Sequence, residues 1–188
     1  MSASQFEAVP HRSPATIVEI RPVLRADYAD IHQLVRIAFG QDNEAILVER
    51  LRASQDYIPD LELVAVGEAQ IVGHIMITKL EIVSDIGKPT LTTILAPLAV
   101  DPARQNLGVG SSLTRHALRR ARELGHTSMI LVGHPTYYPR FGFGRASQWG
   151  IRFATPIRDD VFMAIELVPG ALEAAAGTVT LPPAFDGT

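Results

Sequence analysis

The sequence has 188 residues, of which 47% are hydrophobic and 20% are charged, which is the size and composition of one globular domain with a buried core. Its formal net charge of -3 provides no overall positive field, so nucleic acid is not an expected partner. The lack of cysteine excludes a disulfide framework, thiolate zinc sites and a cysteine nucleophile. Because no apolar signal segment opens the chain and no stretch has the length of a membrane span, we expect a soluble cytoplasmic protein without a membrane partner.

The N-terminal part predicts a short strand followed by two helices. Residues 1–15 are mostly polar and contain two prolines, so we expect a flexible tail there and a single domain over residues 16–188. The β-branched run of residues 16–21 predicts the first strand. Residues 27–40 begin with an aspartate that can cap a helix and end with a glycine that can stop it, and a second helix is expected over residues 44–53.

Three strands are expected next, over residues 61–66, 71–83 and 91–100, because apolar and β-branched residues dominate each run. A short turn joins the first two into a hairpin. Pro97 lies inside the third strand, and since proline cannot donate a hydrogen bond to a neighbouring strand, it marks a bulge or the end of pairing.

A helix over residues 109–124 and a buried strand over residues 128–132 follow. The apolar residues of the helix recur at a spacing of four, four, four and three, which makes one buried face. Because this helix separates two strands, we expect those strands to be parallel. The rest of the chain predicts a helical turn near residues 135–140 and strands near residues 150–153 and 161–167.

The segment before the last long helix, VDPARQNLGVGSSL at residues 100–113, places two glycines at the entrance of the helix. Free backbone N–H groups and the positive end of the helix dipole meet there, which favours an anion such as phosphate. A P-loop would require Gly-Lys-Ser/Thr, and a dinucleotide-binding loop would require a third glycine where Leu113 stands. Neither motif fits, and an ordinary glycine-rich turn before a helix stays open as an alternative.

The same segment contains the pattern Gln/Arg-x-x-Gly-x-Gly/Ala as Gln105, Gly108 and Gly110, directly after the apolar Val-Asp-Pro step of residues 98–102. Further along, Tyr138 precedes a Gly-Phe pair by four residues. In this order the three features resemble the GNAT superfamily of acyl-CoA N-acyltransferases. The stretch ILAPLAV at residues 94–100 and the long C-terminal extension look most like its bacterial branch of predicted N-acetyltransferases. The resemblance implies an α+β fold with a central, mostly antiparallel mixed sheet, a splayed parallel strand pair and flanking helices.

By this resemblance, acetyl-CoA would be the co-substrate and would lie between the strands of residues 91–100 and 128–132. Backbone groups freed by a bulge at Pro97 would pair with the pantetheine arm, and N–H groups of the glycine loop would bind the pyrophosphate. Arg104 and Arg115 could add charge there or be solvated surface residues. No metal is expected, because the six histidines show no ligand spacing. The residues expected to bind the cofactor are Leu98, Ala99, Val100, Arg104, Gln105, Asn106, Leu107, Gly108, Val109, Gly110, Ser111 and Tyr138.

The resemblance also implies catalytic roles. Tyr138 would act as the general acid on the departing thiolate, since a phenol with a reference pKa of about 10 is protonated at neutral pH; its plainer role is to close the core. The backbone N–H of Leu98 or Ala99 is the candidate oxyanion donor. Glu44, His74 and His134 are candidate general bases, but Glu44 could equally be a first-turn acid favoured by the helix dipole, and each histidine a hydrogen-bonded core or rim residue. An amine deprotonated through water would need no protein base.

The predicted function is therefore transfer of the acetyl group from acetyl-CoA to a primary amine, by direct attack in a ternary complex. Two alternatives stay open. One is a non-catalytic acyl-CoA-binding module, favoured by the lack of a carboxylate in the strand of residues 91–100, and the other is a transferase with a different acyl donor. The acceptor could be a small molecule or a protein amine, and edge strands near the C-terminus are compatible with a homodimer.

Overall fold

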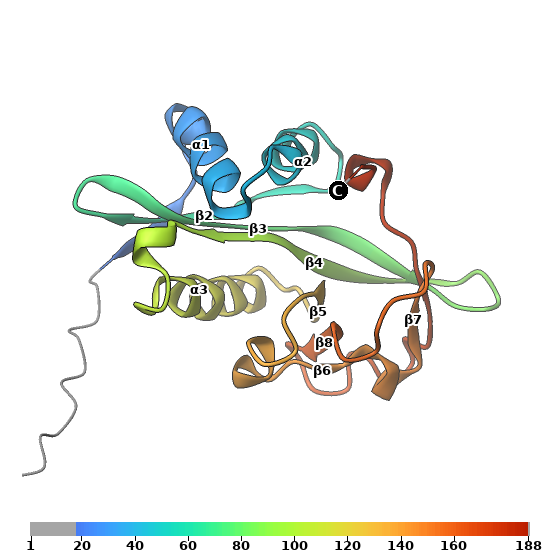
Figure 1. Cartoon of the computed structure of the whole chain (residues 1–188). Coiled ribbons are helices and arrows are strands. Elements are labelled where there is room, and N and C mark those ends of the chain that lie inside the picture. Colours follow the sequence, from blue (N-terminus) through green and yellow to red (C-terminus); the bar gives the residue numbers. More distant parts are fainter. Residues whose placement is uncertain (1–17, 188) are drawn as a thin grey trace, which may run out of the picture.

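The computed structural model describes residues 18–187, which form a mixed sheet of nine strands with helices on both faces (Figure 1). The predicted tail of residues 1–15 and the start of the predicted first strand lie outside the described residues. Among residues 18–187, no helix has the length and apolar character needed to cross a membrane. The strands and α-helices are β1 (Glu19–Pro22), α1 (Tyr28–Phe39), α2 (Asn43–Arg52), β2 (Tyr57–Gly67), β3 (Gln70–Val83), β4 (Pro89–Val100), α3 (Val109–Glu123), β5 (Ser128–Val132), β6 (Gly144–Arg145), β7 (Ile151–Phe153), β8 (Phe162–Glu166) and β9 (Gly177–Val179).

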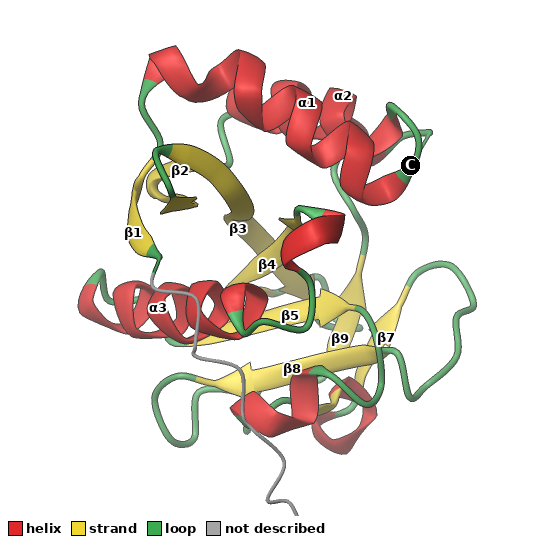
Figure 2. Cartoon of the chain, turned by 60° about the vertical axis from the view of Figure 1, so that its left-hand side comes forward, coloured by secondary structure: helices red, strands yellow, loops and turns green. Residues whose placement is uncertain are grey.

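The sheet has the order β1-β2-β3-β4-β5-β8-β6, and β9 pairs with both β3 and β7. Neighbours along the main path are antiparallel except for β4 and β5, which are parallel as predicted. Helices α1 and α2 cover one face of the sheet and α3 covers the other (Figure 2). The predicted α+β architecture, with a mostly antiparallel mixed sheet flanked by helices, is confirmed.

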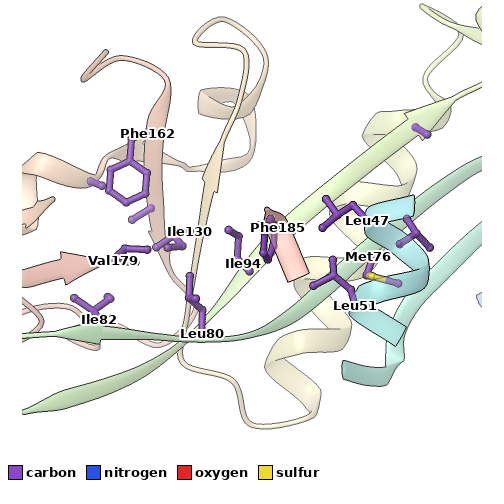
Figure 3. Close-up of a cluster of buried hydrophobic side chains, with 14 of the residues drawn as sticks. Leu47, Leu51, Met76, Leu80, Ile82, Ile94, Ile130, Phe162, Val179 and Phe185 are labelled. Atoms are coloured by element: carbon purple, nitrogen blue, oxygen red, sulfur yellow. The ribbon is translucent and has the colours of Figure 1, made fainter. Parts of the chain in front are cut away.

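The sheet separates two hydrophobic cores. On the face of α1 and α2, Leu47 belongs to a cluster with Met76 and Ile94 that extends to Phe185 near the C-terminus (Figure 3). On the opposite face, α3 buries the apolar stripe that its spacing predicts, with Leu113 fully inaccessible to solvent. Both faces of the central strands are therefore covered, which fixes their position beneath the helices.

β2 is longer than predicted, because it begins at Tyr57 rather than at residue 61. The predicted strand begins beyond Pro59, which cannot donate a hydrogen bond to a neighbouring strand. β1 reaches β2 only from Leu63 onward, and pairing with β3 is interrupted between Tyr57 and Glu62. Proline is tolerated there because its missing N–H breaks no regular pairing.

Asp27 precedes α1, but it does not cap that helix as predicted. Its side chain makes no capping hydrogen bond with α1. It accepts two hydrogen bonds from the guanidinium of Arg21, at 2.6 and 3.0 Å, and one from the N–H of Leu24 at 2.7 Å. The hydrogen bond from Arg21 lowers the pKa of Asp27. The carboxylate thus ties the end of β1 to the turn that leads into α1.

Pro97 lies at the bulge that the sequence predicts. The register of β3 against β4 shifts between Ile75 and Ile77, so that Ala96 and Pro97 together face a single residue, Met76. An extra residue in one strand bends that strand and increases its local twist. β4 therefore changes direction in its C-terminal part.

β4 and β5 pair at one position only, where Ile94 lies opposite Ile130. Beyond that position, β4 continues to Val100 with β3 on one side and no strand on the other. The second edge of β4 is consequently open from residue 96 onward.

A buried polar cluster ties β2, β3 and α2 together. Glu62 and His74 are fully buried, and His74 Nε2 lies 2.9 Å from Glu62 Oε1. The guanidinium of Arg52, at the end of α2, donates to both oxygens of Glu62, and the hydroxyl of Tyr57 donates to Oε2. Arg52 also lies over the ring of Tyr28, 3.9 Å from its centroid. The charge of Glu62 thus has a cation and two further polar partners inside the core.

Burial affects the two titratable groups of this cluster differently. Burial lowers the pKa of His74, against the hydrogen bond with Glu62 that raises it. Burial would raise the pKa of Glu62, but the hydrogen bonds from His74, Arg52 and Tyr57 outweigh it and lower this pKa to about 2. His74 is therefore neutral at pH 7 and donates from Nε2 to the carboxylate, while its Nδ1 has no hydrogen-bond partner among residues 18–187.

Glu62→Gln should lower the free energy of unfolding by about 3 kcal/mol, because it leaves the charge of Arg52 buried without its counter-ion. Glu123→Gln is the matched control, since Glu123 is 53% exposed and pairs with Arg120 at the surface, where an ion pair contributes less than about 1 kcal/mol. Urea denaturation at pH 7 measures both changes. Equal losses for the two variants would contradict the role of the buried cluster.

Acidification should destabilise the protein in two overlapping ranges. Below about pH 6.5 the unfolded chain protonates His74 while the folded chain does not, so unfolding is favoured. Below pH 4.5 the unfolded chain also protonates Glu62, whose pKa in the folded protein is about 2. Thermal unfolding midpoints should therefore fall from pH 7 to pH 4, and the part of the fall above pH 5.5 should diminish in His74→Gln. A midpoint that is constant over this range would show that neither group is linked to folding.

Candidate active site

One large cavity opens beside the unpaired edge of β4. Its volume is about 1020 Å³, at the upper end of the usual range for small-molecule sites. Its walls come from the ends of α1 and α2, from β4, from the loop before α3, from the segment after β5 and from the C-terminal segment. The described residues that line it are Phe39, Glu44, Leu47, Ile94, Leu95, Ala96, Pro97, Leu98, Val100, Arg104, Gln105, Asn106, Gly108, Gly110, Ser111, Val132, Gly133, His134, Thr136, Tyr137, Tyr138, Arg140, Leu181 and Phe185.

The separation of β4 from β5 creates this opening. Leu98 and Val100 line the cavity on the β4 side, and Val132 and Gly133 line it where β5 ends. An open strand edge presents backbone N–H and C=O groups that lack a partner strand. An extended chain that carries amide groups can pair with such an edge as an additional strand would.

The entrance of α3 has the properties of an anion site. Gly108, the residue before the helix, has a φ of +91°, a left-handed conformation that favours glycine. The N–H of Ser112 is the first that bonds back into the helix, to the carbonyl of Gly108 at 2.9 Å. The N–H groups of Val109, Gly110 and Ser111 have no acceptor among the described residues, and they lie at the positive end of the helix dipole.

Gly110 is needed for a different reason than Gly108. A β-carbon at Gly110 would lie 2.8 Å from the hydroxyl of Tyr137 and 3.4 Å from a methyl group of Val100. The hydroxyl of Tyr137 is buried and has no hydrogen-bond partner in the described part of the chain, and its ring packs edge-on against Tyr138 with the centroids 4.9 Å apart. Gly108 therefore permits the left-handed backbone conformation, and Gly110 allows Tyr137 to approach α3 closely.

Two polar side chains of the loop already have partners. Gln105 donates from Nε2 to the carbonyl of Val100 at 3.3 Å, which ties the loop to β4. Arg104 lines the cavity and forms an ion pair with Glu68 at 2.7 Å. Arg115, the other arginine considered for the cofactor, lies in a smaller hollow on the outer side of α3.

The structure brings most of the predicted cofactor residues to the cavity, with three exceptions. Ala99 and Val109 are buried in the two cores, and Leu107 is 37% exposed; none of the three lines the cavity. Ala99 faces the core because it follows Leu98 in a strand, where successive side chains point to opposite faces. Any contact of these three residues with a cofactor would therefore have to be made by their backbone groups.

Tyr138 forms part of the cavity wall. Its ring contacts Phe143 edge-on, and Gly133 makes room for it, since a β-carbon there would collide with the ring. Burial raises the pKa of Tyr138 well above its usual value of 10, because a phenolate in this position would lack water. Its hydroxyl makes no hydrogen bond with a described residue and, unlike that of Tyr137, it is not sealed from solvent.

Glu44 and His134 line the same cavity from different elements. Glu44 lies half-buried in the first turn of α2, and both of its carboxylate oxygens accept from Nε2 of Gln41 at 3.1 Å. His134 is exposed just after β5, and its carbonyl accepts the N–H of Tyr137 in a turn. Within residues 18–187, no group of three or more His, Asp or Glu side chains is arranged to hold a metal ion.

Several lining residues were missed by the sequence analysis. Arg140 donates from Nε to the carbonyl of Tyr137 at 2.9 Å, and its guanidinium lies 4.5 Å from the centroid of that ring. Leu47, Leu181 and Phe185 form part of an apolar wall. In the sequence each of them has the pattern of an ordinary core or turn residue, so only the fold shows that they reach the cavity.

Comparison with known proteins identifies the family of this chain. Residues 19–146 match the family model described as an acetyltransferase (GNAT) domain. The chain belongs to the GNAT acetyltransferase family. Two curated GNAT relatives, both named uncharacterized N-acetyltransferases, come from Escherichia coli K12. YjhQ is 40% identical over 119 residues, which cover 63% of this chain and 65% of YjhQ, and YhbS is 31% identical over 161 residues, which cover 85% of this chain and 93% of YhbS.

Solved GNAT structures agree with this assignment. The crystal structure of YhbS from Escherichia coli in complex with CoA has a TM-score of 0.83 and 29% sequence identity, with 93% of this chain and 95% of that chain covered. A GNAT acetyltransferase from Brucella melitensis in complex with acetyl-CoA has a TM-score of 0.74 and 29% identity, with 91% and 99% covered. The predicted GNAT fold is confirmed, and these relatives support an acyltransferase that uses an acyl-CoA.

Proposed function

We propose that this GNAT protein transfers the acetyl group of acetyl-CoA to a primary amine. The observation that carries the proposal is the continuity of one cavity, which joins the open edge of β4, the N–H groups at the entrance of α3 and the hydroxyl-bearing ring of Tyr138. Each of these parts matches one requirement of the reaction: an edge for an amide-containing arm, donors for a pyrophosphate, and a protonated group near the thioester. The similar proteins crystallised with CoA and acetyl-CoA support the same donor.

Main-chain groups would hold most of the donor. The pantetheine amides would pair with the backbone of Leu98 and Val100, and the pyrophosphate would accept from the N–H groups of Val109, Gly110 and Ser111. Acetyl-CoA supplies the acyl group as an activated thioester. No metal has a part in this proposal.

The acceptor amine would attack the thioester carbonyl as a free base. The charge that develops on the carbonyl oxygen would be stabilised by the backbone N–H of Leu98 or Ala99. As the carbon–sulfur bond breaks, the hydroxyl of Tyr138 would donate a hydrogen bond to the departing sulfur. Because burial raises the pKa of Tyr138, the phenol keeps its proton until sulfur charge develops. The amine's proton would leave to Glu44, to His134 or to water. Tyr138 would give its own proton to the sulfur, so that CoA leaves as the thiol, and Tyr138 would regain a proton from solvent.

Two other functions fit part of the same geometry. A non-catalytic acyl-CoA-binding module would need the donor half of the cavity alone, and a transferase for a different acyl group would need the same half with more room at the thioester. The acceptor as a protein amine, the cytoplasmic location and the homodimer expected from the sequence stay predictions.

Gly110→Ala should weaken CoA binding about tenfold, because the added methyl group lies 2.8 Å from the hydroxyl of Tyr137 and displaces groups at the anion site; tenfold corresponds to about 1.4 kcal/mol. Gly67→Ala is the matched control, since its β-carbon meets only ordinary contacts at 3.5 Å and Gly67 is outside the cavity. Isothermal titration with CoA gives both dissociation constants. Unchanged binding in Gly110→Ala would place the pyrophosphate elsewhere.

Tyr138→Phe should lower kcat about a hundredfold, the contribution typical of a general acid, with the dissociation constant for CoA changed less than twofold. Tyr28→Phe removes a hydroxyl from a ring that is 37% exposed and outside the cavity, so it should leave kcat unchanged. Release of CoA thiol from acetyl-CoA is measured with a panel of primary amines. CoA binding without thiol release for any amine, and no effect of Tyr138→Phe, would favour the non-catalytic module.

A further inference from the structure

The two ends of the cavity differ in chemistry. At the entrance of α3, the lining consists of free N–H groups together with the guanidinium groups of Arg104 and Arg140. At the end formed by α1, α2 and the C-terminal segment, Leu47, Leu181 and Phe185 are lining residues. The first end suits an anion, and the second suits an apolar group.

Part of this apolar end lies outside the segment that matches the family model, which ends at residue 146. Leu181 and Phe185 belong to the C-terminal segment, which follows β9 and returns to α2 (Figure 1). Arg50 of α2 donates from Nη1 to the carbonyl of Asp186 at 2.6 Å, which fastens the segment to the helix. Phe185 is only 8% exposed and lies in one cluster with Leu47 (Figure 3).

A single carboxylate, that of Glu44, lines this cavity among the described residues. Acidic side chains near Glu44 along the chain do have basic partners: Asp42 lies 3.9 Å from Arg36, and Glu49 lies 2.8 Å from His32. Glu44 has none among residues 18–187; its oxygens accept only from the neutral amide of Gln41. A negative charge without an ion-pair partner beside an apolar wall attracts a ligand that is cationic at one end and apolar at the other.

We propose that the acceptor is a primary amine with an alkyl or aryl body, and that Leu181 and Phe185 form the wall that selects it. This inference rests on the proposed acetyltransferase function. The ammonium form of the amine is drawn to Glu44, and its apolar body packs against the two C-terminal residues. The ammonium group first loses one proton to solvent, and the amine nitrogen then forms a bond to the acetyl carbon. As the carbon–sulfur bond breaks, the nitrogen loses a second proton and the sulfur gains one, so that the products are the amide and the CoA thiol.

A long acyl chain on the donor is the competing occupant of the apolar end. Burial of Glu44 against such a chain would remove water from a carboxylate and give it no cation in return, which is unfavourable. An amine supplies that cation. The carboxylate of Glu44 therefore favours the acceptor amine, rather than a longer acyl group, at the apolar end of the cavity.

The test uses the full chain with acetyl-CoA and a series of amines, with CoA thiol release as the readout. From ethylamine to hexylamine, kcat/KM should rise about fourfold for each added methylene that is buried, and 2-phenylethylamine should exceed ethanolamine at least tenfold. If no amine releases CoA, the proposed function itself fails. If amines react but ethylamine, hexylamine and ethanolamine have equal kcat/KM, the function holds and the apolar acceptor is overturned.

Substitution of Leu181 and Phe185 tests whether these two residues select the apolar amine. Phe185→Ala and Leu181→Ala should each reduce the preference for hexylamine over ethanolamine at least fivefold. Phe153→Ala is the matched control, because Phe153 packs in the same core but does not line the cavity, so its preference should equal that of the wild type. Titration with CoA identifies the variants that fold. If Phe185→Ala does not fold, Leu181→Ala still provides the test, because Leu181 is only half-buried. An unchanged preference in a folded wall variant would overturn the assignment.

Two further measurements distinguish an apolar amine from a long acyl chain as the occupant of the apolar end. Glu44→Gln should raise the KM for hexylamine about tenfold, with a smaller change in kcat, whereas a change in kcat alone would overturn the role of Glu44 in attracting the ammonium group. With ethylamine held constant, hexanoyl-CoA should be a poorer donor than acetyl-CoA. A better rate with hexanoyl-CoA that is lost in Phe185→Ala would assign the apolar end to the acyl chain and overturn the proposal, as would activity confined to lysine peptides.

Discussion

The loss of pairing between β4 and β5 is the constraint on which the rest of the site depends. The two strands meet at Ile94 and Ile130 and nowhere else, and the bulge at Ala96 and Pro97 bends β4 away just beyond that point. Had the pairing continued to Val100, β5 would fill the space that the cavity occupies. Backbone polar groups rarely stay without a partner in a folded protein, so an unpaired edge beside a cavity is a place where a ligand or water completes the ladder.

Under the proposed function, the site divides its two substrates between backbone groups and side chains. The donor half consists mainly of main-chain groups, fixed by the sheet and by the start of α3, with glycines where side chains would obstruct. The acceptor half consists of side chains from α1, α2 and the C-terminal segment. Backbone groups are supplied by almost any sequence that keeps the fold, whereas a side-chain wall changes with each substitution. The loop before α3 lies within residues 19–146, which match the family model, whereas Leu181 and Phe185 lie beyond that match.

Local rules explain what could be predicted from the sequence. The spacing in α3, the glycine loop and the proline in β4 each act over a few residues, and all three have the expected place in the structure. The buried cluster of Glu62 and His74 could not be foreseen, because the two residues come from different strands and their partner Arg52 comes from a helix. Proximity of this kind depends on strand register rather than on spacing along the chain.

The same limit applies to the candidate site. Tyr138, Glu44 and His134 reach one cavity, although only the tyrosine belonged to a motif. Leu181 and Phe185 carried no signal at all, since a leucine and a phenylalanine among prolines near the end of a chain are typical of any surface segment that packs back on a core. Their position is set by the pairing of β9 with β3 and by the hydrogen bond from Arg50 to residue 186.

The location of Phe185, three residues before the end of the sequence, has a practical consequence for anyone who handles this protein. Because Phe185 lines the cavity and Arg50 holds the carbonyl of Asp186, a purification tag added at this end of the sequence would be joined only a few residues from the apolar end of the cavity. Such a tag can compete with an amine for the cavity or pull the last turn away from α2, while the loop before α3 stays intact. Preparations with and without it would then bind CoA alike and yet differ in which amines they accept.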